Sequence, residues 1–184
     1  MQFIRRSYMD SVSLFDTEGE MLTMAQLTKV IDYIADTKPM QYNGKGNFDR
    51  FTVERAEGLT DNAIKTLSEK YPDLALPEDY TELLKYSNGI NFYEYADISI
   101  STLEEAFEYT DEEFLENKLL HFATCREDYF FIKCDGSERN IYFSAEGIAE
   151  PQPINMSLKA FLEAGLISGF SYFWLWGNDS YDLY

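Results

Sequence analysis

The chain has 184 residues, of which 45% are hydrophobic and 16% aromatic, and its formal net charge is -18. The length favours one domain with a sizeable core, and the composition excludes disorder over the bulk of the chain. The acidity makes nucleic acid and anionic membranes poor partners and favours basic ones. Because the sequence has neither an apolar run of roughly 18 residues nor the apolar core of a secretory signal, we expect a cytoplasmic protein.

An N-terminal extension, residues 1–57, is expected to pack on the main domain. Within it, residues 11–22 predict a short hairpin, because two apolar runs flank a Thr-Glu-Gly turn. Apolar residues then recur at helical spacing over residues 24–34. Thr23 is placed to cap this helix and Pro39 to end it, so the extension is a hairpin followed by a helix.

Residues 40–48 predict a loop, and residues 49–58 predict a strand. The glycines on either side of Lys45 have neither the spacing of a P-loop nor that of the dinucleotide-binding fingerprint. They therefore predict a turn and not a phosphate site. A helix capped by Thr60 or Asp61 follows.

The stretch LPEDYTELLKYSNGINF, residues 76–92, has the clearest helix start and stop signals of the sequence. Pro77 suits a first helical turn, and the two acidic residues after it lie where the helix dipole favours negative charge. Asn88-Gly89 is a helix stop, and the residues after it predict strand. The inward face of the helix is an apolar stripe made by Tyr80, Leu83 and Leu84.

Residues 101–118 are either one helix or two short ones. They carry two capping-box patterns, namely Ser101 with Glu104 and Thr110 with Glu113. Alternating apolar residues then predict three antiparallel strands over residues 119–125, 128–134 and 140–144. Asp135-Gly136 is a strong turn signal between the last two strands, and Ser157 caps a final short helix.

The C-terminal tail is rich in aromatic residues. Tyr172, Trp174 and Trp176 alternate with Phe173 and Leu175, so both faces of this run are apolar. This pattern favours burial in the core, whereas exposed Trp and Tyr would instead be interface anchors. The sequence leaves Tyr181 and Tyr184 open between the two interpretations.

The order of these parts resembles the SUKH superfamily, the Smi/Knr-like proteins. The matching pieces are LPEDYTELLKYSNGI, ISTLEEAFEY, YFFIKCDGSERNIYF and SLKAFLEAGL, and the resemblance covers roughly residues 58–167. It implies an α+β fold, with an antiparallel sheet meander flanked by helices, and a non-catalytic role. Many bacterial members resemble immunity proteins that bind and silence a toxin domain, often a nuclease. Fungal relatives resemble intracellular regulators of cell-wall synthesis.

The residues offer little for metal binding or catalysis. His121, the only histidine, stands before Cys125 and Cys134 at a spacing that matches no zinc motif. Strand alternation puts His121 and Cys125 on one strand face, in a region rich in core residues. Hairpin pairing keeps the two cysteines apart, which indicates free thiols in a reducing compartment. We therefore expect no metal, no cofactor and no enzyme activity.

Acidic residues concentrate in the second part of the chain. Residues 72–184 hold 6 Lys/Arg against 22 Asp/Glu, whereas residues 1–71 hold 9 against 11. A continuous helix over residues 101–118 would stack glutamates at i, i+4 spacing, where like charges repel. The run is either a solvated face or a docking face for a basic protein. The candidate partner-binding residues are Glu104, Glu105, Glu108, Asp111, Glu112, Glu113 and Glu116.

The sequence thus predicts an α+β protein with an extension, residues 1–57, and a SUKH-like domain, residues 58–184. The preferred function is that of an immunity-type protein that binds and neutralises a basic, nuclease-type toxin. The alternative is an intracellular regulatory adaptor of the Smi/Knr type that has no toxin partner.

Overall fold

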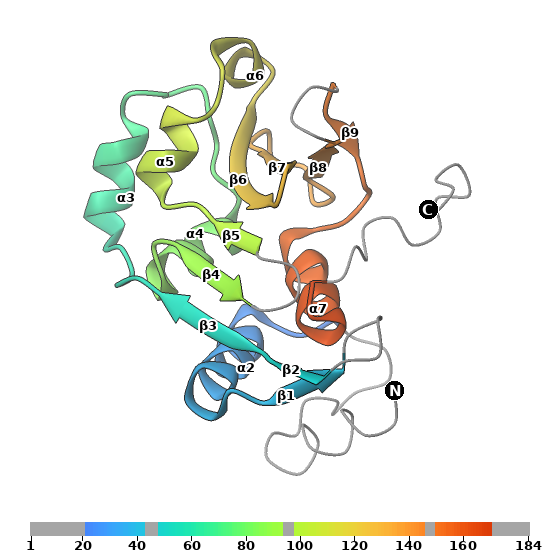
Figure 1. Ribbon diagram of the computed structural model, residues 1–184. Coiled ribbons are helices and arrows are strands. Elements are labelled where there is room, and N and C mark those ends of the chain that lie inside the picture. Colours follow the sequence, from blue (N-terminus) through green and yellow to red (C-terminus); the bar gives the residue numbers. More distant parts are fainter. Residues whose placement is uncertain (1–20, 43–47, 94–97, 146–149, 171–184) are drawn as a thin grey trace.

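The computed structural model describes residues 21–42, 48–93, 98–145 and 150–170 (Figure 1). Its centre is a seven-stranded sheet in which each strand pairs with the next along the chain, always antiparallel. The strands of this sheet are β3 Thr52–Arg55, β4 Ile90–Tyr93, β5 Ile98–Ile100, β6 Leu119–Cys125, β7 Asp128–Lys133, β8 Ile141–Ser144 and β9 Gln152–Pro153. A separate antiparallel pair joins β1 Met40–Tyr42 to β2 Phe48–Arg50.

Six helices in the described ranges surround the sheet. They are α2 Met24–Thr37, α3 Asp61–Ser68, α4 Glu78–Tyr86, α5 Leu103–Glu108, α6 Glu112–Glu116 and α7 Leu158–Ser168. Helix α2 packs on α4 and α7, α3 packs on α5, and α6 lies at one end of β6 (Figure 1). The expected α+β class, an antiparallel meander flanked by helices, is confirmed. None of the described helices has the length and hydropathy needed to cross a bilayer.

The core joins the helices to the sheet through aromatic side chains. The Phe161 ring of α7 lies 5.5 Å from that of Phe122 on β6 and 5.0 Å from that of Phe130 on β7. Tyr80 of α4 meets Phe122 edge to face, with ring centroids 6.3 Å apart. Such edge-on pairs add about 0.5–1.5 kcal/mol to the free energy gained by burying the rings.

Helix α4 forms where its sequence predicts it. The stripe residues Tyr80, Leu83 and Leu84 are fully buried. Pro77 is the N-cap and not a first-turn residue, and the helix ends at Ser87, whose backbone is extended, before the predicted Asn88-Gly89 stop. Gly89 has φ +108°, a conformation that side chains disfavour, where the chain turns into β4. The predicted caps Thr23, Thr60 and Ser157 each accept the expected backbone hydrogen bond at the start of α2, α3 and α7.

The region before residue 58 differs from its prediction. Residues 40–48 were expected to be a loop, but Met40–Tyr42 pairs with Phe48–Arg50 across a five-residue connection. The predicted strand over residues 49–58 is two strands that meet at Phe51, where β2 pairs with β1 and β3 pairs with β4. Phe51 is buried against Phe92, with ring centroids 5.9 Å apart.

Two other predictions lie outside the described residues. One is the hairpin, apart from its last two residues, Met21 and Leu22, and the other is the aromatic tail from residue 171 onward. The division into an extension, residues 1–57, and a domain, residues 58–184, stays a prediction. The seven-stranded sheet takes its first strand, β3, from before residue 58.

Candidate interaction surfaces

The acidic segment contains two helices and not one. Helix α5 ends at Glu108, α6 begins at Glu112, and the residues between them change the chain direction. The stacked series Glu104, Glu108, Glu112 and Glu116 therefore does not exist as one helical face. The like-charge repulsion expected along such a face is relieved by the break between the helices.

The capping pattern of α5 starts one residue later than expected. Thr102, not Ser101, caps the helix: the Glu105 carboxylate accepts from the Thr102 N–H at 2.9 Å, and the Thr102 hydroxyl accepts from the Glu105 N–H at 3.1 Å. The sequence permits both pairs, because Ser-x-x-Glu and Thr-x-x-Glu overlap here. Ser101 still belongs to the sheet, since its N–H donates to the Phe122 carbonyl.

Thr110 is not the cap of α6 that its spacing with Glu113 predicted. Asp111 is the N-cap, and its side chain makes no capping hydrogen bond. The buried Thr110 hydroxyl donates to the Ala106 carbonyl and accepts from the His121 N–H at 2.8 Å. His121 lies on β6 beyond the stretch that pairs with β5, so no β5 carbonyl is opposite its N–H. The Thr110 hydroxyl takes the place of that carbonyl as the hydrogen-bond acceptor.

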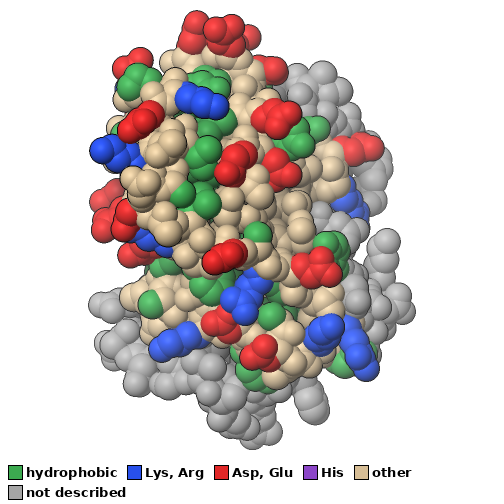
Figure 2. Space-filling model, turned by 90° about the vertical axis from the view of Figure 1, so that its left-hand side faces the viewer, with side chains coloured by type: hydrophobic (Ala, Val, Ile, Leu, Met, Phe, Trp, Pro, Cys, Tyr) green, Lys and Arg blue, Asp and Glu red, His purple; other side chains and the backbone are tan. Residues whose placement is uncertain are grey.

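The seven candidate acids fall into two groups. Glu105 caps α5, and Glu104 accepts from the Asn88 amide at 3.0 Å, so both have structural partners. The other five are exposed, and none forms an ion pair with any described residue. We call these five the acidic end: Glu108, Asp111, Glu112, Glu113 and Glu116. Figure 2 shows carboxylates gathered at the end of the molecule where α6 lies.

A cluster of aromatic rings adjoins the acidic end. The His121 ring lies 6.4 Å from that of Tyr109, 5.5 Å from that of Tyr129 and 5.8 Å from that of Phe131. The Phe114 ring of α6 packs against the Phe131 ring, with centroids 5.0 Å apart. We call Tyr109, His121, Tyr129 and Phe131 the aromatic patch. The sequence does not reveal this patch, because Tyr129 reaches His121 through the pairing of β6 with β7, and Tyr109 reaches it where Thr110 bonds to the His121 N–H.

His121 and Cys125 do not share a strand face, contrary to the alternation argument. The register of β6 shifts between His121 and Ala123, which is a β-bulge. After the bulge Ala123 and Cys125 belong to the main core, whereas His121 pairs with Phe131 in the aromatic patch. The extra residue shifts the alternation by one position, so His121 and Cys125 point to opposite faces.

Both cysteines are buried, and neither forms a disulfide. Pairing places Cys134 beside Lys118 and Leu119 and not opposite Cys125, as expected. Burial raises the pKa of the Cys134 thiol to about 12, which keeps this thiol protonated and unreactive. Within the part of the chain that the structure describes, no group of three or more His, Cys, Asp or Glu side chains could hold a metal ion.

The electrostatic state of His121 follows from its burial. The side chain is only 2% exposed, and desolvation lowers the pKa of His121 to about 4, against a smaller opposing effect from Glu105. The imidazole is therefore neutral at physiological pH. Its Nε2 atom lies 3.0 Å from the Thr124 hydroxyl, within hydrogen-bond distance.

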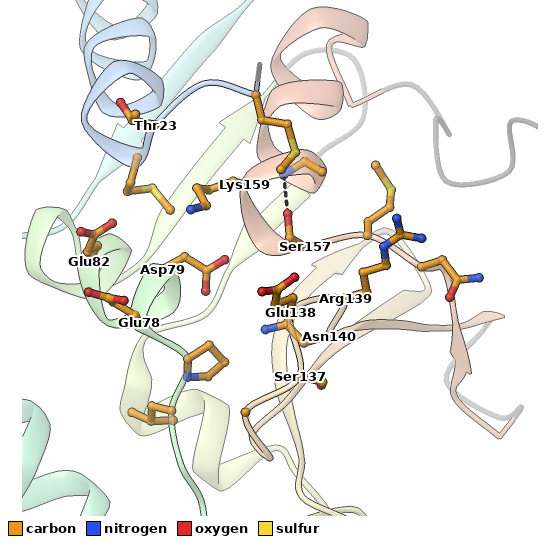
Figure 3. Close-up of a pocket in the computed structure, with 18 of the residues that line it drawn as sticks. Thr23, Glu78, Asp79, Glu82, Ser137, Glu138, Arg139, Asn140, Ser157 and Lys159 are labelled. Atoms are coloured by element: carbon orange, nitrogen blue, oxygen red, sulfur yellow. Dashed lines mark hydrogen bonds between the residues drawn. The ribbon is translucent and has the colours of Figure 1, made fainter. Parts of the chain in front are cut away.

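A groove of about 1230 Å³ opens where the N-termini of α2, α4 and α7 meet the turn between β7 and β8. The side chains of Asp79 and Lys159 reach into it from α4 and α7 (Figure 3). Burial raises the pKa of Asp79, and the nearby Lys159 partly offsets this effect. Asn140 lines the groove at 2% exposure, and its Oδ1 has no hydrogen-bond partner among the described residues.

The groove residues do not assemble a recognisable catalytic set. The two hydroxyls placed at helix starts, those of Thr23 and Ser157, accept capping hydrogen bonds from the Gln26 and Ala160 N–H groups. The only histidine of the sequence lies in the aromatic patch, so the lining residues hold no nucleophile paired with an imidazole base. The groove presents side chains of both charges and the Asn140 amide oxygen, which lacks a partner among the described residues.

The fold and these surfaces define an α+β protein whose exposed features suit binding more than catalysis. The chain belongs to the SMI1/KNR4 family (SUKH-1), whose family model matches residues 58–164. This family consists of immunity-type or Smi/Knr-like proteins that act in general through protein–protein interaction. A search of curated proteins found no significant match.

Proposed function

We propose that this protein is an immunity-type member of its family that binds and neutralises a basic, nuclease-type toxin domain in the cytoplasm. The family assignment supports a role in protein binding. The basic nature of the partner is inferred from the acidic end, where five exposed carboxylates have no ion-pair partner among the described residues.

The acidic end suits a basic partner on physical grounds. Proteins that bind nucleic acid need a positive surface, because phosphate contacts supply most of their affinity. A negative surface on the inhibitor attracts such a protein from a distance, and it raises the association rate more than the strength of the final complex. Carboxylates already paired with local lysines would lose much of this attraction.

The fold accommodates part of the charge of the acidic end. Two short helices replace the single helix that would have stacked like charges, and Glu112 and Glu113 lie in the first turn of α6, where the helix dipole favours negative charge. Glu108 and Glu116 end α5 and α6, where the dipole gives no such support. All five acids remain exposed and without an ion pair among the described residues.

The groove favours the second candidate, a regulatory adaptor of the Smi/Knr type. A cavity lined by Asp79, Lys159 and Asn140 offers a second binding surface with chemistry unlike that of the acidic end. An adaptor needs two such surfaces, whereas an inhibitor needs one. The two candidates differ in what happens to the partner, since only the toxin loses an activity.

Affinity capture from cells that naturally express the protein, followed by mass spectrometry, identifies the partner. The purified partner is then assayed for nuclease activity and for growth inhibition, with and without one equivalent of the protein. We expect a basic protein whose toxic activity disappears at equimolar ratio. A partner with no toxic activity, or one that stays active when bound, would contradict the immunity proposal and support the adaptor.

Two triple variants sharpen this experiment. The first is Glu108→Gln, Glu112→Gln and Glu116→Gln in the acidic end. The second removes the same charge from exposed acids outside both the acidic end and the groove, through Glu57→Gln, Glu69→Gln and Glu150→Gln. We expect the second variant to neutralise the toxin as the parent does, and the first variant to neutralise it less well. Equal neutralisation by the two variants would show that only the net charge of the protein matters.

A further inference from the structure

The aromatic patch contains two exposed tyrosines whose hydroxyls make no hydrogen bond to the described residues. Tyr109 is 60% exposed and Tyr129 is 37% exposed, and both rings contact the same buried imidazole. By contrast, Tyr93 is also 37% exposed, but its hydroxyl donates to Glu54 at 3.0 Å.

The patch is held in place by packing and by the backbone. Thr110, the neighbour of Tyr109, is tied to the His121 N–H, and Tyr129 pairs with Thr124 across the β6–β7 ladder. Phe131 is buried beside His121. Rings fixed in this way lose little conformational entropy when a partner covers them, which is one reason that tyrosine is enriched among interface hot spots.

The chain on both sides of Tyr109 is acidic, and the His121 ring that both tyrosines contact is neutral. Glu108 and Asp111 stand on either side of the Tyr109–Thr110 segment, and Glu105 is close enough to affect the charge state of His121. No lysine or arginine occurs from residue 86 to residue 117. A cation that approaches the tyrosine faces therefore meets attractive charge and no imidazolium.

We propose that the aromatic patch is the docking site for arginine side chains on the basic partner. This inference rests on the proposed function, because it takes the partner to be basic. The tyrosine faces attract a cation through the ring quadrupole, and the neighbouring carboxylates accept hydrogen bonds from it. Arginine fits better than lysine, since its planar guanidinium stacks on rings and is more weakly hydrated.

The test uses a defined probe, so that it does not depend on the identity of the partner. A short acetylated and amidated peptide with two arginines in a glycine–serine background is titrated into the full chain at low salt. A matched peptide carries lysines in place of the arginines. Binding is followed by NMR shifts of the aromatic ring signals, which report on the tyrosines and on the single histidine directly.

The variants separate the rings from the charge. Tyr109→Leu combined with Tyr129→Leu leaves a smaller apolar side chain at each position and removes the π faces. Tyr93→Leu is the control outside the patch, at the same exposure as Tyr129. We expect the arginine peptide to shift the Tyr109, Tyr129 and His121 signals and to bind the double variant about fivefold more weakly. The lysine peptide should bind less well than the arginine peptide.

The proposal would be overturned if the double variant bound the arginine peptide as well as the parent did, or if Tyr93→Leu caused the same loss. The melting temperature of the double variant shows whether it is folded. If it is not, Tyr109→Leu alone, at the more exposed position, replaces it in the titration. The peptide result is independent of the capture experiment. A patch that binds arginine while the captured partner proves acidic would refute the toxin proposal and leave the site intact.

Discussion

The buried histidine makes the stability of the fold depend on pH in a predictable way. In the unfolded chain His121 takes up a proton near pH 6.5, whereas in the folded chain burial lowers its pKa to about 4. The unfolded state therefore binds more protons throughout this window, and the free energy of unfolding falls as the pH falls. The contribution is fully present above pH 6.5 and is lost as the pH drops towards 4.

The magnitude follows from the two pKa values. The linkage relation gives a loss of about 2 kcal/mol in the free energy of unfolding between pH 8 and pH 5. For a chain of this size, that loss lowers the melting temperature by about 4–8 °C. Carboxylates that become protonated in the same range act in the opposite sense, because they relieve the repulsion of a net charge of -18.

The variant His121→Gln isolates the effect of the histidine. Glutamine can still bond to the Thr124 hydroxyl, and it does not titrate. Thermal melts of the parent and the variant are compared from pH 8 to pH 5, and the parent should lose more stability than the variant by the amount given above. Parallel curves would refute the reasoning, as would an NMR titration of the His121 ring with a pKa above 6.

Three further substitutions test how the fold is held together. Thr110→Val leaves the buried His121 N–H without its acceptor and should cost about 1–3 kcal/mol in chemical denaturation. Thr28→Val is the nearly neutral control, because the Thr28 hydroxyl on α2 donates only to the carbonyl of Ala25 in its own helix. Gly58→Ala would place a Cβ 1.9 Å from the Lys85 carbonyl oxygen, so it should destabilise by about 1–3 kcal/mol, and a stability equal to that of the parent would contradict this packing. Tyr86→Phe removes a hydroxyl that donates to Asp32 at 2.7 Å and accepts from Arg55 at 3.1 Å, which links α4 to α2 and β3. Its melting temperature should fall by about 2–4 °C for each kcal/mol lost, and an unchanged value would show that the Arg55–Asp32 ion pair at 2.8 Å suffices without it.

Local signals predicted the helices well. The apolar stripe and the acidic first turn of α4 are as predicted, because both depend on residues within one short segment. Both ends differ slightly, since Pro77 precedes the helix as its N-cap and Ser87 ends it two residues before Gly89. The Ser101 assignment missed by a single residue for a non-local reason. Both Ser101 and Thr102 stand three residues before a glutamate, and the pairing of Ser101 with Phe122 on β6 decides between them.

The aromatic patch shows where sequence reasoning stops. Strict alternation placed His121 in the core face with Cys125, and the bulge between His121 and Ala123 reverses that assignment. A bulge of this kind leaves no distinct pattern in the residues themselves. The groove is likewise invisible in the sequence, because its lining comes from three helix starts that are far apart along the chain.

If the acidic end recruits a basic protein, the rate constant of their association depends on attraction between opposite charges. The rate is measured by surface plasmon resonance with the purified partner from the capture experiment, at low salt and at about 0.5 M salt, where charges farther apart than a few ångströms are screened. We predict that added salt slows association of the parent strongly. The Glu108→Gln, Glu112→Gln and Glu116→Gln variant should associate slowly even at low salt. A rate that is insensitive to salt, or equal in parent and variant, would contradict the account.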